Sequence, residues 1–173
     1  MGYVVERHIN SPIKDNPPER PPPAVSEPKT LLDWTFDDLS GEATPLTRWR
    51  GKLLVLNFWA TWCPPCLREI PAFIELQRRY AADGVQFVGI ALDQVEAVAS
   101  FASEKAMNYP VLVGHEDVIR FMQSLGNAIG GLPYTAVIGA NGEVLTTHQG
   151  EWEFEVAEQS ILFYLENPGS ASN

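Results

Sequence analysis

The chain has 173 residues, 45% of them hydrophobic, a length that suits one domain with a full core plus a tail. Its formal net charge of −10 argues against non-specific nucleic-acid binding, because such binding requires Lys and Arg to neutralise phosphates. No run of about 20 apolar residues is present, so the sequence predicts no membrane span.

Residues 1–30 are predicted to form a Pro-rich flexible linker or tail. This segment holds seven of the fourteen prolines, its basic and acidic residues balance, and large apolar residues are scarce. Such a composition favours an extended, polyproline-like chain over a packed core. A spacer that holds a domain away from a membrane fits this composition, and a ligand for a proline-binding groove is the alternative. The first residues also lack the apolar centre of a signal peptide.

Residues 31–168 are predicted to form the folded domain. Apolar alternation and continuous apolar runs predict strands at 34–39, 53–59, 85–91, 111–113, 134–138 and 144–148. Apolar spacings of three and four predict a helix from the cysteine motif to Asp83-Gly84, and further helices at 95–106, 118–125 and 156–165. Asn141-Gly142 accepts the positive φ angles of a hairpin turn. Strands that alternate with helices before a late hairpin predict an α/β fold, with a central mixed sheet flanked by helices on both faces.

The charged residues from Ala140 onward are all glutamates. A run of like charge is most simply a solvated face that aids solubility. Docking of a basic partner on this acidic stretch is the alternative.

The only two cysteines, Cys63 and Cys66, lie three residues apart. A disulfide between them closes so small a ring that it removes little entropy from the unfolded chain, so it is a poor structural staple. The motif follows a buried strand and opens a helix, where residues three apart have Cα atoms about 5 Å apart, within the range that a disulfide accepts. The pair can therefore open and close with little backbone movement, which indicates redox chemistry.

The position of each cysteine predicts its role in thiol–disulfide exchange. Cys63 precedes the first helical turn, near solvent and free amides, so it attacks; Cys66 points inward and resolves the mixed disulfide. Half-ionising a thiol at pH 7 requires about 2 kcal/mol of stabilisation, of which a helix N-terminus supplies about 0.3–1 kcal/mol. The second thiol and nearby amides must supply the rest. Pro64 and Pro65 are both compatible with a helix start.

Two other uses of a Cys-x-x-Cys motif fit this chain poorly. Structural zinc needs four ligands, but there is no further cysteine and the three histidines are scattered, at His8, His115 and His148. Covalent haem attachment requires a His directly after the second cysteine, where this chain has Leu67. We therefore expect no metal and no cofactor.

The segment Gly51–Pro71, which runs through Asn57-Phe58-Trp59-Ala60-Thr61 into the cysteine motif, resembles the active-site block of TlpA/ResA/DsbE-like thioredoxins. These are bacterial proteins that are usually exported or membrane-anchored. Gly84–Ile90 and Gly131–Thr135 are similar to the family's next strand and its cis-proline segment, and the resemblance covers about residues 31–165. It implies a thioredoxin-like fold and the activity of a thiol–disulfide oxidoreductase.

The resemblance also implies site residues beyond the two cysteines. Leu132–Pro133 would be a cis peptide beside the dithiol whose backbone pairs with substrate; the alternative is an ordinary trans proline that opens a strand. Glu69 would be a catalytic group that tunes the proton transfers of the dithiol; the alternative is an exposed acid in the first turns of a helix. Trp62 and Pro64 would join Leu132 and Pro133 in binding the substrate.

Asn57 stands where typical thioredoxins carry a buried Asp. Asn cannot accept a proton, so Glu69 or water would be the base for Cys66; alternatively, Asn57 is a buried amide that ties its strand to the neighbouring strands. Trp59 is expected in the core. Trp62 either contacts substrates or packs in the core, and Tyr134 is a weaker candidate for the same substrate groove.

We therefore expect an exported reductase that takes electrons from a membrane thiol donor and reduces disulfides of client proteins. In the family that the chain resembles, such clients are often apocytochrome c or proteins of copper-site assembly. Disulfide oxidation or isomerisation, and a non-catalytic binding module, are the alternatives. The expected partners are the client and the donor, without nucleic acid, and the chain is expected to act as a monomer. The expected location is periplasmic or extracytoplasmic, with any membrane anchor in a segment outside this chain.

Overall fold

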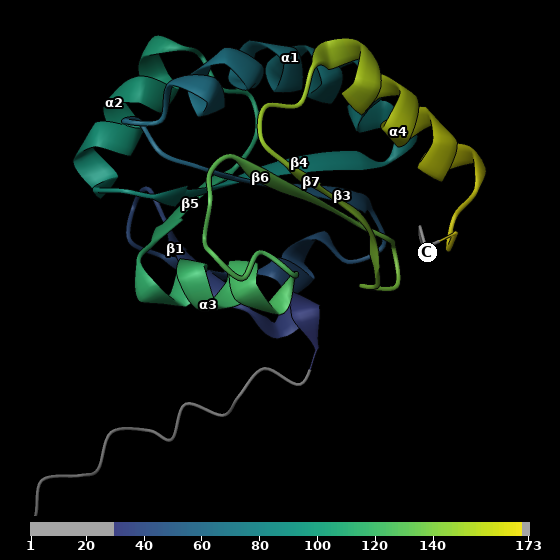
Figure 1. The fold of residues 1–173 in the computed structure, drawn as a ribbon, viewed down its shortest axis with the longest axis horizontal. Helices are drawn as coiled ribbons and strands as arrows, with labels where there is room; N and C mark the ends of the chain where they lie inside the picture. The colour runs from purple at the N-terminus through teal and green to yellow at the C-terminus, as the bar shows by residue number, and fades with distance from the viewer. Residues whose placement is uncertain (1–29, 171–173) are drawn as a thin grey trace, which may run out of the picture.

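The central element of the structure is a seven-stranded mixed sheet with the strand order β2-β1-β5-β4-β3-β6-β7 (Figure 1). The computed structural model describes residues 30–170. Strand β3 pairs in parallel with β4, and β4 with β5, while all other pairs are antiparallel. The strands are β1 Thr35–Asp38, β2 Ala43–Pro45, β3 Leu53–Trp59, β4 Val85–Leu92, β5 Val111–Gly114, β6 Tyr134–Ile138 and β7 Val144–Gln149.

Helices cover both faces of the sheet, as predicted. Three helices, α1 Pro64–Tyr80, α2 Val95–Glu104 and α4 Phe154–Glu166, lie on one face, and α3 Glu116–Ser124 lies on the other (Figure 1). Short 3₁₀ turns are η1 Leu31–Asp33, η2 Leu46–Trp49 and η3 Ala81–Asp83. Between residues 30 and 170, no helix combines the length and the apolar character that crossing a membrane requires.

Strand β3 is buried along its whole length, because both faces of the sheet are covered at its centre. Successive side chains of a strand point to opposite faces. Phe58 therefore faces α3 and packs on Phe121, while Val55 and Trp59 lie on the face that α1 covers. Asn57 is the polar exception in this apolar strand, and it lies on the same face as Trp59.

The predicted elements are all present, with several shifted ends. Strands β3 and β6 have their predicted bounds. The helix predicted at 95–106 ends at Glu104, and Ala106 adopts a positive φ of 50° that a helix cannot continue through. The helix predicted at 118–125 begins at Glu116 and ends at Ser124. Strand β2 was not predicted, because three residues are too few to show a periodic pattern.

The strand predicted at 34–39 is shorter and corresponds to β1. The predicted linker, residues 1–30, lies outside the described residues except for Thr30. The division of the chain at residue 30 therefore stays a prediction.

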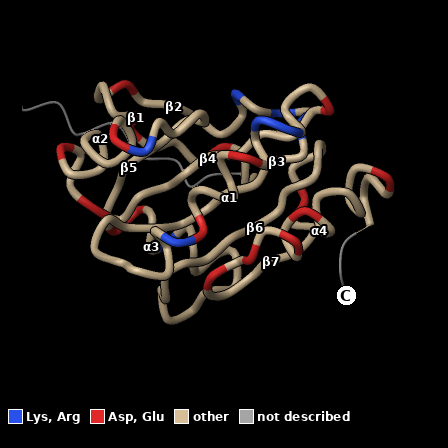
Figure 2. The backbone as a smooth tube through the Cα atoms, turned by 90° about the horizontal axis from the view of Figure 1, so that it is seen from above, with Lys and Arg blue, Asp and Glu red and all other residues tan. Residues whose placement is uncertain are grey.

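The glutamates of this stretch lie just before β7, between β7 and α4, and on α4, where Figure 2 shows acidic but no basic residues. Two of its glutamates pair with arginines of α1: Arg68 with Glu151 at 2.7 Å, and Arg79 with Glu158 at 3.0 Å. Exposed ion pairs of this kind contribute about 0–1 kcal/mol each. The stretch is thus a surface that α1 partly neutralises, which favours the prediction of a solvated face.

Candidate active site

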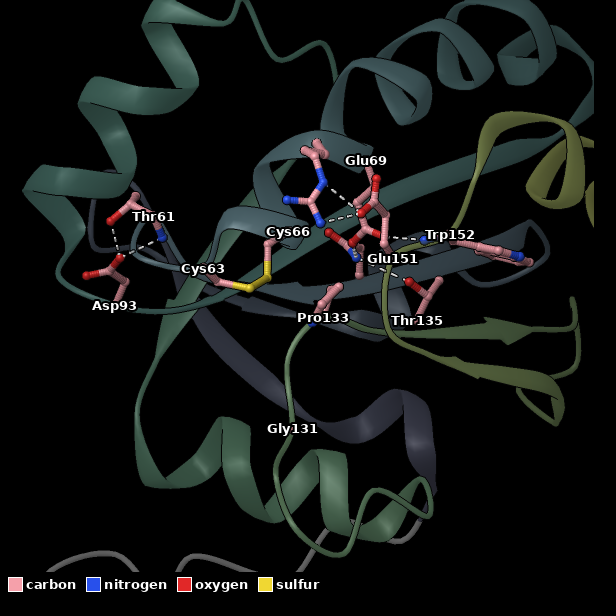
Figure 3. The surroundings of a disulfide bond; sticks show 12 residues. Thr61, Cys63, Cys66, Glu69, Asp93, Gly131, Pro133, Thr135, Glu151 and Trp152 are labelled. Atoms are coloured by element: carbon pink, nitrogen blue, oxygen red, sulfur yellow. Dashed lines mark hydrogen bonds and ion pairs between the residues drawn. A yellow bond between two sulfur atoms is a disulfide. The ribbon is translucent and has the colours of Figure 1, made fainter.

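Cys63 and Cys66 form a disulfide at the N-terminus of α1, directly after the central strand β3 (Figure 3). Their Cα atoms lie 5.3 Å apart, in agreement with the predicted helical spacing. Cys63 is the N-cap residue and is 5% exposed, while Cys66 is fully buried. The attacking sulfur expected from sequence is thus the more accessible of the two, and the resolving sulfur faces the core.

The two prolines of the motif occupy the first two positions of α1. A side chain at the N-cap usually accepts a hydrogen bond from the amide of the second or third helical residue. Pro65, at the second position, has no N–H to donate, so the first backbone amide available to the Cys63 sulfur is that of Cys66. The helix start therefore offers Cys63 fewer donors than an ordinary helix N-terminus does.

The turn before Cys63 is fixed by a carboxylate at the end of β4. Asp93 Oδ2 accepts hydrogen bonds from both the backbone N–H and the hydroxyl of Thr61, and Asp93 Oδ1 accepts from the Gln94 N–H. Burial works to raise the pKa of Asp93, but these hydrogen bonds outweigh it and the pKa lies below its ordinary value. Asp93 thus stays ionised and holds the turn that carries Trp62 and Cys63.

Leu132–Pro133 is a cis peptide, as the resemblance implied, and Pro133 is drawn close to the disulfide in Figure 3. Antiparallel pairing of β6 with β3 matches Tyr134 to Phe58 and so carries this peptide to the end of β3 where the cysteine motif begins. Two side chains hold the loop that precedes the cis peptide. Asn127 bonds both backbone groups of Gly131 through its side chain, and Gln149 donates to the carbonyls of Gly131 and Pro133.

Glu69 is buried, with 2% of its surface exposed, which overturns the alternative of an exposed acid on the helix. It follows Cys66 by three residues on α1 and points toward the sheet (Figure 3). Asn57 Nδ2 donates to Glu69 Oε1 at 2.7 Å, and the Trp152 backbone N–H donates to Glu69 Oε2 at 2.8 Å. Asn57 Nδ2 also lies 3.2 Å from the hydroxyl of Thr135 on β6.

Burial raises the pKa of Glu69 to about 7, because the carboxylate loses its hydration. The hydrogen bonds from Trp152 and Asn57 oppose this shift, and the nearby charge of Glu151 adds to it. A carboxyl with a pKa near 7 exchanges protons readily at neutral pH. Glu69 is therefore equipped to take up and release a proton behind the dithiol.

Arg68 and Glu151 form an ion pair on the solvent side of the buried Glu69. The Arg68 guanidinium contacts Glu151 Oε2 through Nε at 2.8 Å and Nη2 at 2.7 Å. Glu151 immediately precedes Trp152, whose ring stacks on His148 of β7. His148 Nε2 lies 3.1 Å from the Glu151 carbonyl, so this ring has a hydrogen-bond partner.

The other aromatic candidates divide clearly between surface and core. Trp62 is 64% exposed beside the cysteines, so the core alternative for it is wrong. Trp59 is buried as expected. Tyr134 is also buried, and its hydroxyl donates to the Leu125 carbonyl, so its assignment to the substrate groove is wrong. Pro64 is exposed at the helix start.

Several residues around the site were not found from sequence. Asp93, Asn127 and Trp152 lie 27 to 86 residues from the nearest cysteine, and only the fold brings them close. An exposed Ile129, with 91% of its surface accessible, was also missed. The end of its side chain lies 3.8 Å from the position that a Cβ on Gly131 would take, at the start of the segment that leads into the cis peptide. None of these residues belongs to a local motif that could have revealed it.

A dithiol that opens a helix after the central strand of a mixed sheet, with a cis-proline beside it, defines the thioredoxin-fold thiol–disulfide oxidoreductases. A family model for Redoxin matches residues 23–161 of this chain. Thiol-disulfide oxidoreductase ResA of Geobacillus thermodenitrificans is 35% identical over 139 residues, which cover 80% of this chain and 78% of that protein. The chain belongs to the Redoxin family, and it is a thiol–disulfide oxidoreductase similar to ResA and DsbE.

Solved structures agree with this assignment. A thiol:disulfide interchange protein of Chlorobium tepidum is 29% identical, with a TM-score of 0.71 over 82% of this chain and 99% of that chain. A secreted disulfide oxidoreductase of Mycobacterium tuberculosis, homologous to DsbE of E. coli, is 26% identical, with a TM-score of 0.65 over 77% of this chain and 97% of that chain. The fold and the class of reaction are therefore shared with proteins of known structure.

Proposed function

We propose that this protein is an extracytoplasmic reductase of client-protein disulfides. The Cys63 thiolate attacks one sulfur of the client disulfide, forms a mixed disulfide and releases the other client sulfur as a thiolate. The Cys66 thiolate then attacks the Cys63 sulfur, which frees the second client thiol and leaves the Cys63–Cys66 disulfide. The two protons of the dithiol end on the two client thiols, and a membrane thiol donor returns the protein to its reduced state.

The observation that carries the direction of transfer is the pair of prolines at the start of α1. Strong oxidants of this class owe their high potential to a stabilised thiolate in the reduced form. Here the missing amide of Pro65 withholds one of the hydrogen bonds that would stabilise the Cys63 thiolate. A less stabilised thiolate favours the disulfide state of this protein, so its dithiol gives electrons away.

Glu69 is proposed as the proton acceptor for Cys66. Asn57 cannot accept a proton, whereas Glu69 lies one helical turn beyond Cys66 and has a pKa of about 7. Its burial keeps bulk water from competing for the proton. Glu69 therefore takes the proton of Cys66 as that thiol becomes the resolving nucleophile.

Client binding is proposed to involve Trp62, Pro64, Leu132 and Pro133. Trp62 offers an exposed apolar ring beside Cys63, and the backbone of the cis peptide faces the same disulfide (Figure 3). An extended client segment can pair with the backbone at Leu132 while its cysteine meets Cys63. The secreted relative from Mycobacterium tuberculosis supports an extracytoplasmic location. Apocytochrome c and copper-site proteins are the client classes that the resemblance suggests.

The reduction potential tests this proposal. It is obtained by equilibrating the protein with known ratios of thiol and disulfide and by following the fraction of oxidised Cys63–Cys66. We expect a value close to that of thioredoxin, about −270 mV. A value near −120 mV, typical of a strong oxidant, would contradict the reductase and favour the oxidant alternative. In parallel, the reduced protein should cleave insulin disulfides, and Cys63→Ser should abolish this activity; absence of turnover in the wild type would favour a binding module.

A further inference from the structure

Three buried polar groups behind the dithiol have no hydrogen-bond partner among residues 30–170. They are Asn57 Oδ1, the indole N–H of Trp59 and the hydroxyl of Tyr109. A buried polar group without a partner costs about 1–3 kcal/mol, and native proteins contain few of them. Three such groups close together therefore point to a shared partner.

Trp59 and Tyr109 meet above Gly89 of β4. A Cβ placed on Gly89 would lie 2.9 Å from Trp59 Nε1 and 3.5 Å from Tyr109 Cε2, the ring carbon adjacent to the one that bears the hydroxyl. The indole nitrogen and the phenol thus approach each other over a strand position that has no side chain.

The orientation of Asn57 directs its oxygen to the same place. Gly89 is the register partner of Asn57 on the neighbouring strand β4. Asn57 Nδ2 faces Glu69 and Thr135, and Thr135 lies on β6, on the opposite side of β3 from β4. Because the amide is planar, its oxygen points away from β6, to the side of β3 on which β4 and Gly89 lie.

The three groups have complementary hydrogen-bonding character. Asn57 Oδ1 is an acceptor, the Trp59 indole is a donor, and the Tyr109 hydroxyl can be either. Buried water typically makes about three hydrogen bonds to otherwise unsatisfied polar groups. One water molecule can donate to Asn57, accept from Trp59 and bond to Tyr109 in either direction.

We propose that a single buried water molecule binds above Gly89, held by Asn57 Oδ1, the Trp59 indole and the Tyr109 hydroxyl, and that it fixes the Asn57 amide in the orientation that presents Nδ2 to Glu69. Gly89 and Tyr109 are then positioning residues, because they act on Glu69 through the water and Asn57. The part that concerns Glu69 as a proton acceptor rests on the proposed function, whereas the water site does not.

The consequence of the fixed amide is a bias toward the ionised form of Glu69. An N–H donor stabilises a carboxylate, whereas a reversed amide would present its oxygen and stabilise the protonated acid. Other titratable groups also face Glu69. They are Glu151 before α4 and Tyr109 before β5, with His148 of β7 behind Trp152, and, once the disulfide is reduced, Cys66 on the same helix. Burial raises the pKa of Tyr109, and the charge of Glu69 adds to this effect, so Tyr109 stays neutral.

Water exchange spectroscopy tests the site directly. In the oxidised full-length protein, the Trp59 indole proton should show a cross-peak to long-lived water in a ¹⁵N-edited rotating-frame experiment. Gly89→Ala should abolish this cross-peak, because the new Cβ takes the space beside the indole. A wild-type protein without the cross-peak would overturn the proposal.

Tyr109→Phe tests the link to Glu69 without adding volume. It should raise the titration midpoint of the Glu69 carboxyl, followed by ¹³C chemical shift, by about one pH unit, the size of a weakened hydrogen bond to a charged group. Tyr164→Phe is the matched control, because it removes a buried hydroxyl that donates to the Leu145 carbonyl away from this site. An equal shift in both variants, or none in Tyr109→Phe, would contradict the positioning role. Neither readout depends on turnover, so failure of the reductase function would leave the water site intact.

Discussion

The Trp152 backbone N–H donates a 2.8 Å hydrogen bond to Glu69 Oε2, across 83 residues of sequence. The segment between β7 and α4 thereby covers a carboxyl that follows Cys66 by one turn of α1. Arg68 and Glu151 form an ion pair on the solvent side of this carboxyl. Glu69 is therefore buried by a segment late in the chain that packs over α1, a helix from the first half of the chain.

Replacement of Glu69 by Gln should slow the resolving step, because Cys66 then lacks a proton acceptor. We expect the rate of resolution of a mixed disulfide at Cys63 to fall about a hundredfold above pH 7 and to lose its inflection near pH 7. Stopped-flow release of a fluorescent client thiol measures this rate. Glu75→Gln on the exposed side of α1 is the control, and an inflection that persists in Glu69→Gln would exclude the role.

Glu69 should also make the oxidised protein less stable as the pH rises. Its pKa is raised from 4.5 to about 7 on folding, so the folded chain holds this proton more tightly than the unfolded chain does. The free energy of unfolding should therefore fall between pH 4.5 and 7 by about 3 kcal/mol from this group and level off above pH 7.

Urea unfolding of the oxidised protein at pH 5 and pH 8 measures this loss. Glu69→Gln should remove most of the difference between the two values. Glu75→Gln should keep it, because Glu75 has a pKa of about 2 owing to hydrogen bonds from Arg78 and Arg79 and stays ionised throughout this range. An equal pH dependence of the free energy of unfolding in the wild type and in Glu69→Gln would show that folding leaves the pKa of Glu69 unchanged.

Restoring an amide at the second position of α1 should make the protein more oxidising. Pro65→Ala provides an N–H that can donate to the Cys63 thiolate and so stabilises the reduced form. We expect the reduction potential to rise by about 30 mV. Pro71→Ala restores an amide in the middle of the same helix and should leave the potential unchanged. A potential that does not move in Pro65→Ala would remove the support for the reductase direction.

Loss of the Asp93 carboxylate should loosen the turn before Cys63. Asp93→Ala removes the oxygen that accepts both hydrogen bonds from Thr61. Exchange of the Thr61 amide proton should accelerate about tenfold, as measured by hydrogen exchange. Asp83→Ala in η3 is an exposed control. Unchanged protection of Thr61 would mean that the turn is held without Asp93.

Ile129 should contribute to client binding through its exposed side chain beside Gly131. Ile129→Ser should raise KM for a protein disulfide about tenfold with little change in kcat, because about 1.4 kcal/mol of apolar contact is lost. Activity toward a small disulfide should stay the same. Val156→Ser, which removes an exposed apolar side chain from α4, is the control. An equal effect on both substrates would assign Ile129 to the loop structure and not to client contact.

Much of this protein follows from local patterns in the sequence. The apolar run of β3, the spacing of Cys63 and Cys66, and the helical period after them are readable without a structure, because each depends on residues within one or two turns of each other. The three-residue strand β2 was missed for the same reason, since it has too few residues to form a pattern. The cis peptide at Pro133 was predicted from the family resemblance alone, because local sequence rarely distinguishes a cis from a trans proline.

The sequence by itself determined the fold class and the redox pair, because hydrophobic periodicity and a helix start are local properties of the chain. Only the tertiary structure decided that Glu69 is buried, since its burial depends on Asn57 beneath it and Trp152 above it. Proton affinity is set by desolvation and by neighbouring charges, and these are fixed only when distant segments pack together. The dithiol is therefore encoded by one short sequence motif, whereas the groups that govern its proton transfers come together only in the complete fold.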